Sequence, residues 1–441
     1  MHIDMPQGAY RIIEKLNDNG FEAYIVGGCV RDSLRGKVPS DWDICTSAKP
    51  EEMVKIFQDK KLIPTGIQHG TLTILEHDGA YEVTTFRIDG EYKDHRRPEQ
   101  VAFTAQLKED LSRRDFTINA MAWHPQKGII DLFGGVTDLE NRIVRAVGMP
   151  RKRFDEDGLR MLRMVRFATV LGFDYDHETY QAAKNMSYLL QHISKERIQV
   201  EFNKILISEH VSRGLQDLYD LGMYAYFLPE VCHQVGFVQD GGHHFLDVFE
   251  HALLATGLIE NELVLRLAMF LHDIGKPFSW VEKETHDSFP NHAEVGGNIA
   301  NKLLRDLKYD NQTRKQVAGL VAHHNDYIEN NDSSIRQCLA TLGEIQTRRL
   351  LKIKVADLLA HDMKAQREDV LQLFYEIEQR LNTIVERGDC YSIKQLAING
   401  KDLMAIGYHG TAIGEALDDL LAKVIQEPTL NQKISLLKLL R

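Results

Sequence analysis

The sequence has few cysteines, and they are not arranged as a scaffold. Five occur among 441 residues, far apart and without a Cys-x-x-Cys pair. Neither a disulfide framework nor a structural zinc site is expected, and a reducing cytoplasm suits such a chain. The five are Cys29, Cys45, Cys232, Cys338 and Cys390.

Long apolar runs and an excess of basic charge are also missing. No stretch approaches the roughly 18 apolar residues of a membrane helix. Met1 to Tyr10 has no basic segment followed by an apolar one, so no secretory signal is visible. We therefore expect no membrane partner and a cytoplasmic location. The formal net charge of −11 excludes a globally basic nucleic-acid binder but not a local basic track.

What is present indicates a globular chain of two or three domains, with 43% apolar and 27% charged residues. The first ~140 residues alternate helical and strand patterns, which predicts a small mixed sheet. After Gly148-Met149-Pro150 the pattern is helical nearly to the end. We therefore predict an α+β chain with four parts: a head (1–140), a helical neck (141–235), a helical body (236–375) and a helical tail (376–441).

Apolar periodicity predicts individual elements in the head and neck. Residues 85–103 lack that periodicity and are predicted to be a long loop. The predicted helices are 9–17, 29–35, 50–59, 156–170 and 176–190, and the predicted strands are 22–26, 41–45 and a hairpin of 71–76 and 80–87.

A glycine turn and two strand carboxylates form the first candidate site. The segment Gly27–Asp32 follows a strand and opens a helix, where glycines let the backbone approach a phosphate. A purely structural turn is the alternative. Asp41 and Asp43 share one face of a strand, and two carboxylates plus substrate phosphates are the usual Mg²⁺ arrangement. A solvated strand end is the alternative here. Glu82 is a candidate third acid.

Arginines follow at two places. Arg113 and Arg114 are adjacent at a predicted helix start, where they could hold a triphosphate. The alternative is an ordinary salt-bridged face with neighbouring acids. Further on, arginines follow Asp157 at steps of three, each rising about 4.5 Å and turning back about 60°. This second set consists of Arg160, Arg163 and Arg166. The alternative is a surface ion pair between Asp157 and Arg160, which is the commoner reason for this spacing.

In this order the segments resemble bacterial class II tRNA nucleotidyltransferases, the CCA-adding enzymes. The resemblance covers roughly residues 20–230 and implies a polymerase-beta-like nucleotidyltransferase head before the helical neck, body and tail. The segments that carry it are Gly27–Asp32, the Asp41/Asp43 pair, Glu82–Arg87, Arg113–Ala120 and Glu156–Arg160.

The resemblance implies that C, C and A are added to the 3′ end of tRNA from CTP and ATP, without a nucleic-acid template. A 3′-hydroxyl attacks the α-phosphate and pyrophosphate leaves. Two Mg²⁺ ions at Asp41 and Asp43 would activate the hydroxyl and stabilise the leaving oxygens. The implied nucleotide contacts are Gly28, Arg31, Arg114, Asp157, Arg160, Arg163 and Arg166.

Hydrogen bonding suggests how a protein selects these bases. Cytosine and adenine each present an amino donor beside a ring-nitrogen acceptor. Asp157 can only accept and Arg160 can only donate, so the pair suits C and A. Uracil and guanine present the opposite order, and an unmade buried hydrogen bond to a charged group costs roughly 1–3 kcal/mol.

Because tRNA is a polyanion, a chain with an acidic total charge needs a local basic segment to bind it. Residues 142–166 hold eight Arg or Lys against three acids, a local charge of +5. This segment is a candidate phosphate track.

Histidines mark the second candidate site. Nine of the 19 fall between His243 and His361, and imidazoles with carboxylates are the usual ligands of transition metals. The strongest single segment is Phe270–Pro277. The order His251, His272-Asp273, His292, His323-His324, Asp357 resembles the HD-domain metal phosphohydrolases over about 240–365.

By this resemblance the body is an HD-type domain with one or two metals. His251, His272, Asp273 and Asp357 would hold one ion. His292 with His323 or His324 would hold a second, and Ni²⁺, Mn²⁺ or Co²⁺ suits imidazole ligands. The implied activity is hydrolysis of phosphate monoesters or 2′,3′-cyclic phosphates. An HD fold without activity is the alternative.

Other readings of the whole chain stay open. An enzyme that adds only the terminal A is one. An enzyme that adds only C is less favoured, because the segments Asp89–Tyr92 and Arg96–Pro98 look intact where C-only enzymes lack the flexible loop. A poly(A) polymerase would not usually carry an HD domain. The rival from another class is a phosphohydrolase whose head only binds nucleotide or RNA.

Overall fold

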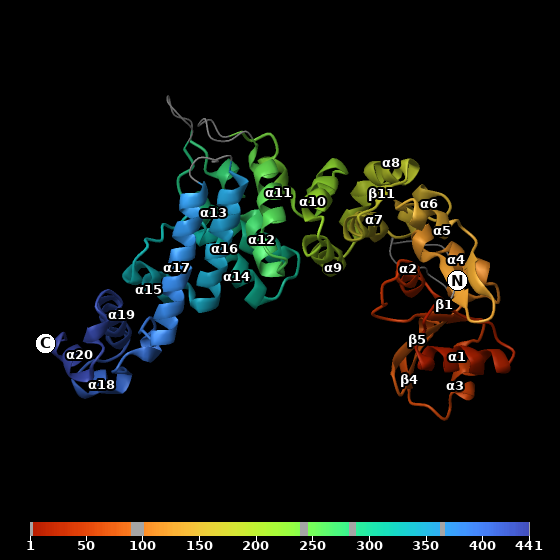
Figure 1. Cartoon of the computed structure of the whole chain (residues 1–441), viewed down its shortest axis with the longest axis horizontal. Coiled ribbons are helices and arrows are strands. Elements are labelled where there is room, and N and C mark those ends of the chain that lie inside the picture. Colours follow the sequence, from red (N-terminus) through yellow and green to blue (C-terminus); the bar gives the residue numbers. More distant parts are fainter. Residues whose placement is uncertain (1–2, 90–100, 239–245, 282–287, 362–366, 441) are drawn as a thin grey trace. The chain divides into compact units, whose positions relative to one another are not determined.

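Alternating apolar residues of the first 131 residues build one mixed sheet. The computed structural model describes residues 3–89, 101–238, 246–281, 288–361 and 367–440 (Figure 1). The sheet has the order β3-β4-β5-β2-β1-β8-β9, in which β2 and β5 are parallel and the other neighbours antiparallel. Its strands are β1 (Ala23–Val26), β2 (Ile44–Thr46), β3 (Leu62–Gly66), β4 (Thr71–Glu76), β5 (Gly79–Thr85), β8 (Met121–His124) and β9 (Gly128–Asp131).

Two short strand pairs lie outside this sheet. β6 (Arg87–Asp89) pairs with β7 (Val101–Phe103), and β10 (Ile143–Val144) pairs with β11 (Asp174–Tyr175). Alternate residues of β1 face different apolar clusters, since Ile25 packs with the α1 residues and Tyr24 packs with Phe86 and Leu111. Strand β1 is therefore buried on both faces.

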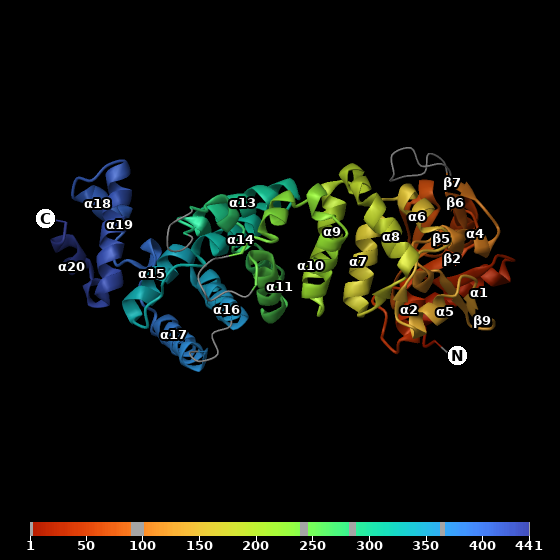
Figure 2. The same cartoon turned by 90° about the horizontal axis from the view of Figure 1, so that it is seen from above.

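Helices surround the sheet and continue beyond it within a first compact unit, Met1–Pro229. They are red to yellow-green in Figure 1 and are also visible in Figure 2. They are α1 (Gln7–Asp18), α2 (Gly28–Leu34), α3 (Pro50–Ile56), α4 (Leu107–Ser112), α5 (Gly135–Glu140), α6 (Pro150–Glu156), α7 (Leu159–Leu171), α8 (His177–Met186), α9 (Lys195–Leu206) and α10 (Val211–Asp220).

The second unit, Glu230–Arg441, has helices as its only elements among the described residues, apart from an isolated bridge between Val281 and Ser288. Nowhere in the described chain is a helix both long and apolar enough to cross a membrane. The helices are α11 (Val248–Leu258), α12 (Leu263–Leu271), α13 (His292–Asp306), α14 (Asn311–His323), α15 (Asp332–Leu342), α16 (Glu344–Ala360), α17 (Arg367–Arg387), α18 (Gly400–Ala405), α19 (Thr411–Gln426) and α20 (Lys433–Lys438).

The predicted fold class is confirmed, but several local predictions are wrong. The strand predicted over 41–45 begins only at Ile44, so Asp41 and Asp43 precede β2. The helix predicted over 156–170 is broken at Asp157, whose backbone is extended (φ −148°, ψ 105°). Arg113 follows α4 as its last cap residue and does not start a helix. Contacts with residues distant in sequence, such as the ion pair of Asp157 with Arg197, can override local periodicity.

The region predicted as a loop is partly structured. Its two ends form β6 and β7, while residues 90–100, with most of the expected flexible segment, lie outside the described residues. The finer division into head, neck, body and tail stays a prediction.

Gly275 allows the turn after α12 to contact α13. A Cβ atom at this position would lie 2.0 Å from the carbonyl oxygen of His292 and 2.6 Å from the amide nitrogen of Gly296. Its φ of −77° is open to any residue, so lack of space, and not backbone strain, requires glycine. Gly319, on α14, provides a contrast because a Cβ there would meet nothing within 4 Å.

We predict that Gly275→Ala lowers the free energy of unfolding by about 1–3 kcal/mol, because the methyl group would push α13 away. Gly319→Ala is the matched control and should raise it by up to about 1 kcal/mol through helix propensity. Urea unfolding followed by circular dichroism measures both. Wild-type behaviour of Gly275→Ala would contradict the packing described here.

Candidate active sites

Three carboxylates lie at one end of β2 and β5. In the parallel pairing Ile44 lies opposite Val83, so the preceding residues, Asp43 and Glu82, are neighbours when the register is extended by one. Asp41 lies two residues before Asp43, and all three side chains are exposed. Partial desolvation and the negative charges of Asp41 and Glu82 raise the pKa of Asp43 to about 6, although Arg114 opposes them.

This carboxylate group fits a hard cation with further ligands. The three residues are not among the sets whose ligand atoms all lie within 4.8 Å of one another. Mg²⁺ needs only one or two protein carboxylates when substrate phosphates complete its shell. The repulsion that raises the pKa of Asp43 is relieved by a cation, so the donor set suits Mg²⁺.

The guanidinium groups of Arg31 and Arg114 lie next to the glycine turn between β1 and α2. Gly27 has a φ of 84°, and a Cβ there would lie 3.0 Å from Nη1 of Arg114. A Cβ on Gly28 would lie 3.7 Å from Nη2 of Arg31. Nε of Arg114 is buried without a hydrogen-bond partner among the described residues. Glycine backbone, two guanidinium groups and an open donor together suit a phosphate group.

Arg163 and Arg166 join Arg31 around the ring of Phe167. The three guanidinium carbons lie 5.3, 3.8 and 5.3 Å from its centroid, respectively. Arg163 also donates to Asp115 Oδ2 from Nε at 2.8 Å and from Nη2 at 2.6 Å. The sequence-predicted arginines are therefore brought together, on an aromatic support that sequence reasoning missed.

Two buried acids keep these arginines in place. Burial alone would raise the pKa of Asp115, but the charge of Arg163 and hydrogen bonds outweigh it and hold the pKa below its usual range. Glu201, on α9, lies 2.5 Å from Arg166 Nε and 3.5 Å from Arg163 Nη1. Glu201 was also missed, because no local spacing relates α9 to α7.

Asp157 and Arg160 do not pair with each other. Asp157 accepts from Arg197 at 3.2 and 2.7 Å and from the amide of Leu159 at 3.1 Å. Arg160 is buried and donates to Glu156 Oε2 at 2.7 Å and to the carbonyl oxygen of Arg113 at 3.0 Å. The alternative interpretation, a surface ion pair between the two, is thus wrong, and each residue is oriented by a separate partner.

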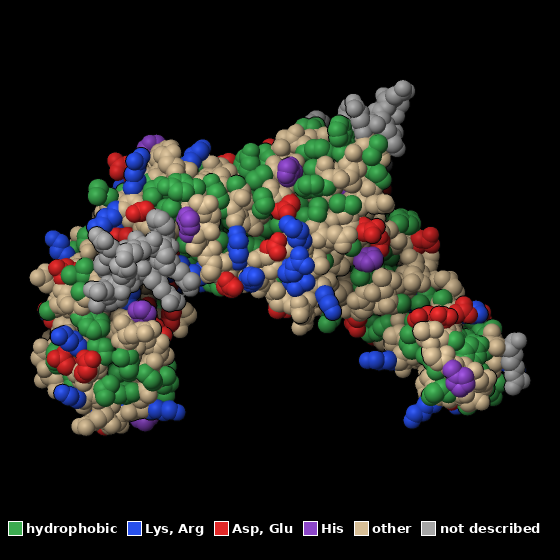
Figure 3. All heavy atoms as spheres, turned by 180° about the vertical axis from the view of Figure 1, so that it is seen from behind, with side chains coloured by type: hydrophobic (Ala, Val, Ile, Leu, Met, Phe, Trp, Pro, Cys, Tyr) green, Lys and Arg blue, Asp and Glu red, His purple; other side chains and the backbone are tan. Residues whose placement is uncertain are grey.

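Three arginines of the basic segment 142–166 pair with acids outside the segment. Arg145 pairs with Asp138 and Asp176, and Arg163 and Arg166 pair with the two buried acids described above. On the face drawn in Figure 3, basic and acidic side chains likewise lie beside one another. A count along the sequence therefore overstates the local positive field.

The second unit gathers most of the predicted HD residues into one cluster. Three overlapping sets have ligand atoms within 4.8 Å of one another. His251, on α11, belongs to two of the sets, and Asp273, in the turn after α12, also belongs to two. The other members lie on or directly after α12, α13, α14 and α16. The sets are His251, Asp357 and His361; His251, His272 and Asp273; and Asp273, His292 and His324.

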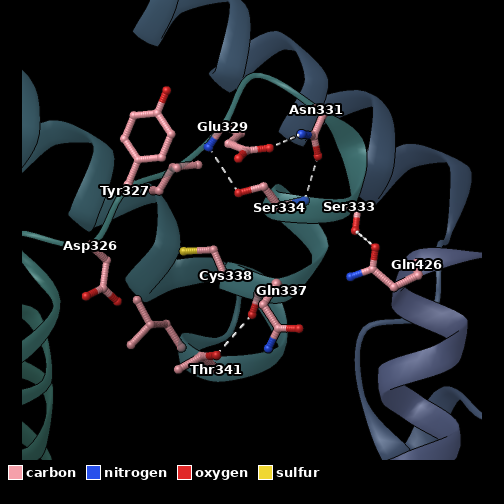
Figure 4. Close-up of a pocket in the computed structure, with 12 residues that line it drawn as sticks. Asp326, Tyr327, Glu329, Asn331, Ser333, Ser334, Gln337, Cys338, Thr341 and Gln426 are labelled. Atoms are coloured by element: carbon pink, nitrogen blue, oxygen red, sulfur yellow. Dashed lines mark hydrogen bonds between the residues drawn. The ribbon is translucent and has the colours of Figure 1, made fainter.

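His324 belongs to this cluster, whereas its neighbour His323 does not. His323 Nδ1 lies 2.7 Å from Asp326 Oδ2, on the outer side of α14. Asp326 lines a pocket of about 400 Å³ between the start of α15 and Gln426 (Figure 4). Its polar side chains bond to one another, and none of the described lining residues is basic or a histidine. Its described lining therefore offers no cationic side chain to a phosphate.

The cluster fits a transition-metal ion. Nδ1 of three histidines lies at a backbone carbonyl: 2.7 Å for His272, 3.0 Å for His292 and 2.7 Å for His324. Each Nδ1 must therefore carry the proton, which leaves Nε2 as a lone-pair donor. Nε2 of His272 is buried without a hydrogen bond, although Asp273 Oδ2 lies 3.2 Å away.

The charges of the cluster favour a bound cation. Burial lowers the pKa of His272, but Asp273 and Asp357 outweigh this and raise it to about 10. Lys276 lies 2.6 Å from Asp273 Oδ2, and the buried Asp273 has a pKa well below its usual range because His272 and Lys276 overcome the effect of burial. Two ionised carboxylates facing five imidazoles suit Mn²⁺, Co²⁺, Ni²⁺ or Zn²⁺.

Comparison with known families matches three regions of the chain. The family described as "Poly A polymerase head domain" matches residues 23–145. The family described as "Probable RNA and SrmB- binding site of polymerase A" matches residues 172–234. The HD domain family matches residues 241–362.

Individual proteins extend this likeness to the whole length. The CCA-adding enzyme of Ligilactobacillus salivarius is 50% identical over 218 residues, which are 49% of this chain and 54% of that protein. The CCA-adding enzyme of Pediococcus pentosaceus is 36% identical over 440 residues, 98% of each chain. The crystal structure of the Bacillus stearothermophilus CCA-adding enzyme in complex with CTP has a TM-score of 0.75 at 31% identity, covering 99% of this chain and 97% of that one. The chain therefore belongs to the family of CCA-adding enzymes, as its motifs predicted.

Proposed function

We propose that this chain adds C, C and A to the 3′ end of tRNA from CTP and ATP in the cytoplasm, and releases pyrophosphate. The observation that carries the proposal is the position of Asp41, Asp43 and Glu82 beside the arginines of the glycine turn. Opposite charges meet there at the open end of the sheet, which suits a nucleoside triphosphate with its metal ions.

In this proposal the residues of the chain have distinct tasks. Arg31 and Arg114, with the backbone of Gly28, hold the triphosphate, and Arg163 and Arg166 balance its charge. Asp41 and Asp43 hold Mg²⁺, with Glu82 adding negative charge beside them. Bound Mg²⁺ would lower the pKa of the attacking 3′-hydroxyl and balance charge on the leaving pyrophosphate.

Base selection falls to Asp157 and Arg160. Asp157 accepts from the exocyclic amino group of cytosine or adenine, and Arg160 donates to the adjacent ring nitrogen. Arg197 and Glu156 orient the two side chains, so the arrangement of acceptor and donor is fixed before the nucleotide arrives. An enzyme that adds only A remains the alternative within this class.

We also propose the four-part division into head, neck, body and tail, with a working HD centre in the body. Its histidines and carboxylates would hold Ni²⁺, Mn²⁺ or Co²⁺ and hydrolyse phosphate monoesters or 2′,3′-cyclic phosphates. Lys276 and the imidazoles would attract the phosphate. A phosphohydrolase with a head that only binds nucleotide is not favoured, because binding requires no exposed group of three carboxylates.

The carboxylates are tested by isosteric substitution. Asp43→Asn should reduce nucleotide incorporation into tRNA that lacks its 3′ CCA by more than about 100-fold, because the neutral amide no longer holds the metal. Asp59→Asn changes a carboxylate on the surface of the same unit and should leave incorporation unchanged. Incorporation above a hundredth of the wild-type rate in folded Asp43→Asn would refute the metal assignment.

Base selection is tested by Asp157→Asn. The amide presents a donor as well as an acceptor, so UTP and GTP should gain about tenfold relative to CTP and ATP, as a penalty of roughly 1–3 kcal/mol predicts. The measurement is the ratio of kcat/KM among the four nucleotides. Asp174→Asn, which removes an exposed pair with Arg213, is the control. A general loss of rate at a fixed ratio would show that Asp157 is only structural.

The HD centre is tested separately. His272→Ala should abolish Ni²⁺- or Mn²⁺-stimulated hydrolysis of p-nitrophenyl phosphate and 2′,3′-cyclic AMP, while CCA addition persists. His323→Ala should retain both activities, because His323 points out of the cluster. No hydrolysis by wild type with any of these metals would favour an inactive HD fold, and loss of CCA addition in folded His272→Ala would refute independence of the two centres.

A further inference from the structure

The HD cluster contains one histidine that is absent from the motif that carries the resemblance. His361 follows the last residue of α16 and lies four residues after Asp357. Residues at this spacing share one helix face. Its side chain is mostly buried, with 21% exposed. The sequence pattern gave it no role beyond membership in a histidine-rich region.

His361 lies close to two other residues of the cluster, His251 and Asp357. Suitable ligand atoms of His251, Asp357 and His361 all lie within 4.8 Å of one another. The rings of His251 and His361 have centroids 4.6 Å apart at an interplanar angle of 89°. Asp357 Oδ1 lies 2.9 Å from His251 Nε2 and 3.7 Å from His361 Nδ1. These three side chains form a corner of the cluster that a single ion can span.

The hydrogen bond of His361 sets the tautomer needed for ligation. Nδ1 lies 2.9 Å from the backbone carbonyl oxygen of Asp357. A carbonyl only accepts, so Nδ1 carries the proton and Nε2 keeps its lone pair. His272, His292 and His324 make the same bond to carbonyl groups three residues earlier. His361 is therefore prepared in the same way as the histidines of the motif.

A simpler role for His361 would be to cap α16. A histidine near a helix end can bond to the last carbonyl groups, and the bond to Asp357 satisfies that role. Capping uses only Nδ1, however, and does not require the imidazole ring to lie 4.6 Å from the ring of His251 and beside the carboxylate of Asp357. The proximity to these two residues is the observation that capping leaves unexplained.

We propose that Nε2 of His361 is a ligand of a divalent transition-metal ion held at the corner formed with His251 and Asp357. Imidazole-rich sets with one carboxylate select ions such as Co²⁺, Ni²⁺, Mn²⁺ or Zn²⁺. Because His251 also belongs to the set of His272 and Asp273, His361 extends the centre beyond the motif residues. The inference rests on the proposed HD metal centre and adds a ligand to it.

The substitution His361→Asn separates ligation from capping. The asparagine amide sits near the position of Nδ1 and can still donate to the carbonyl of Asp357, but it has no atom at the position of Nε2. His323→Asn is the matched control, since it keeps a donor to Asp326 and lies outside every ligand set.

The full-length protein, freed of metal by a chelator, is titrated with Co²⁺ and followed by equilibrium dialysis and visible absorption. We expect His361→Asn to weaken Co²⁺ binding at one position by at least about tenfold. We also expect a change in the position and intensity of the d–d bands. His323→Asn should match wild type, and circular dichroism and CCA addition should be unchanged in both variants.

The outcomes distinguish this inference from the proposal on which it rests. Wild-type Co²⁺ affinity and an unchanged spectrum in His361→Asn would overturn the role of His361 and leave the HD centre intact. No Co²⁺ bound by wild type would overturn both. Equal weakening in His323→Asn would assign the effect to a general disturbance of the unit and would overturn the ligand assignment.

Discussion

A buried carboxylate, Asp115, connects the parts of the nucleotide site. One oxygen accepts from Arg163 of α7, and the other accepts from the amide of Asn119. Asn119 in turn accepts from Arg31 of α2 at 2.6 Å. Two cations from different helices are therefore tied to one acid and one amide. A charge this deeply buried is stable only when such partners surround it, and so the positions of both arginines depend on Asp115.

Asp273 has the corresponding place in the second unit, with imidazoles in place of guanidinium groups. His272, Lys276 and His324 approach it to between 2.6 and 3.4 Å. The difference in partners is the basis of the different metals that we propose for the two centres. Guanidinium groups can only donate and so are suited to the phosphates of a substrate, whereas imidazoles with a fixed Nδ1 proton are ligands themselves. The same need to pair a buried acid thus produces two kinds of chemistry.

Much of the fold and of both sites was predictable from local patterns. Period-two and period-3.6 signals gave β1, α1 and the β4–β5 hairpin, and the motif residues of both centres follow a characteristic order. What local patterns could not reveal are partners distant in sequence. Arg197, Glu201 and Phe167 shape the first site through contacts across helices. His361 was missed because a histidine at a helix end has no signature until Asp357 and His251 lie beside it.

The wrong helix prediction at Asp157 concerns a residue to which the proposed function assigns base selection. Uninterrupted periodicity favoured a single helix, in which Asp157 and Arg160 would pair and neutralise each other. The extended backbone at Asp157 separates α6 from α7 and lets Arg197 reach the carboxylate. Arg160 then turns to Glu156 and keeps donor groups beyond those that it uses for Glu156, Arg153 and Arg113. The proposed base selection uses an acceptor and a donor that do not pair with each other, and the break between α6 and α7 is what separates them.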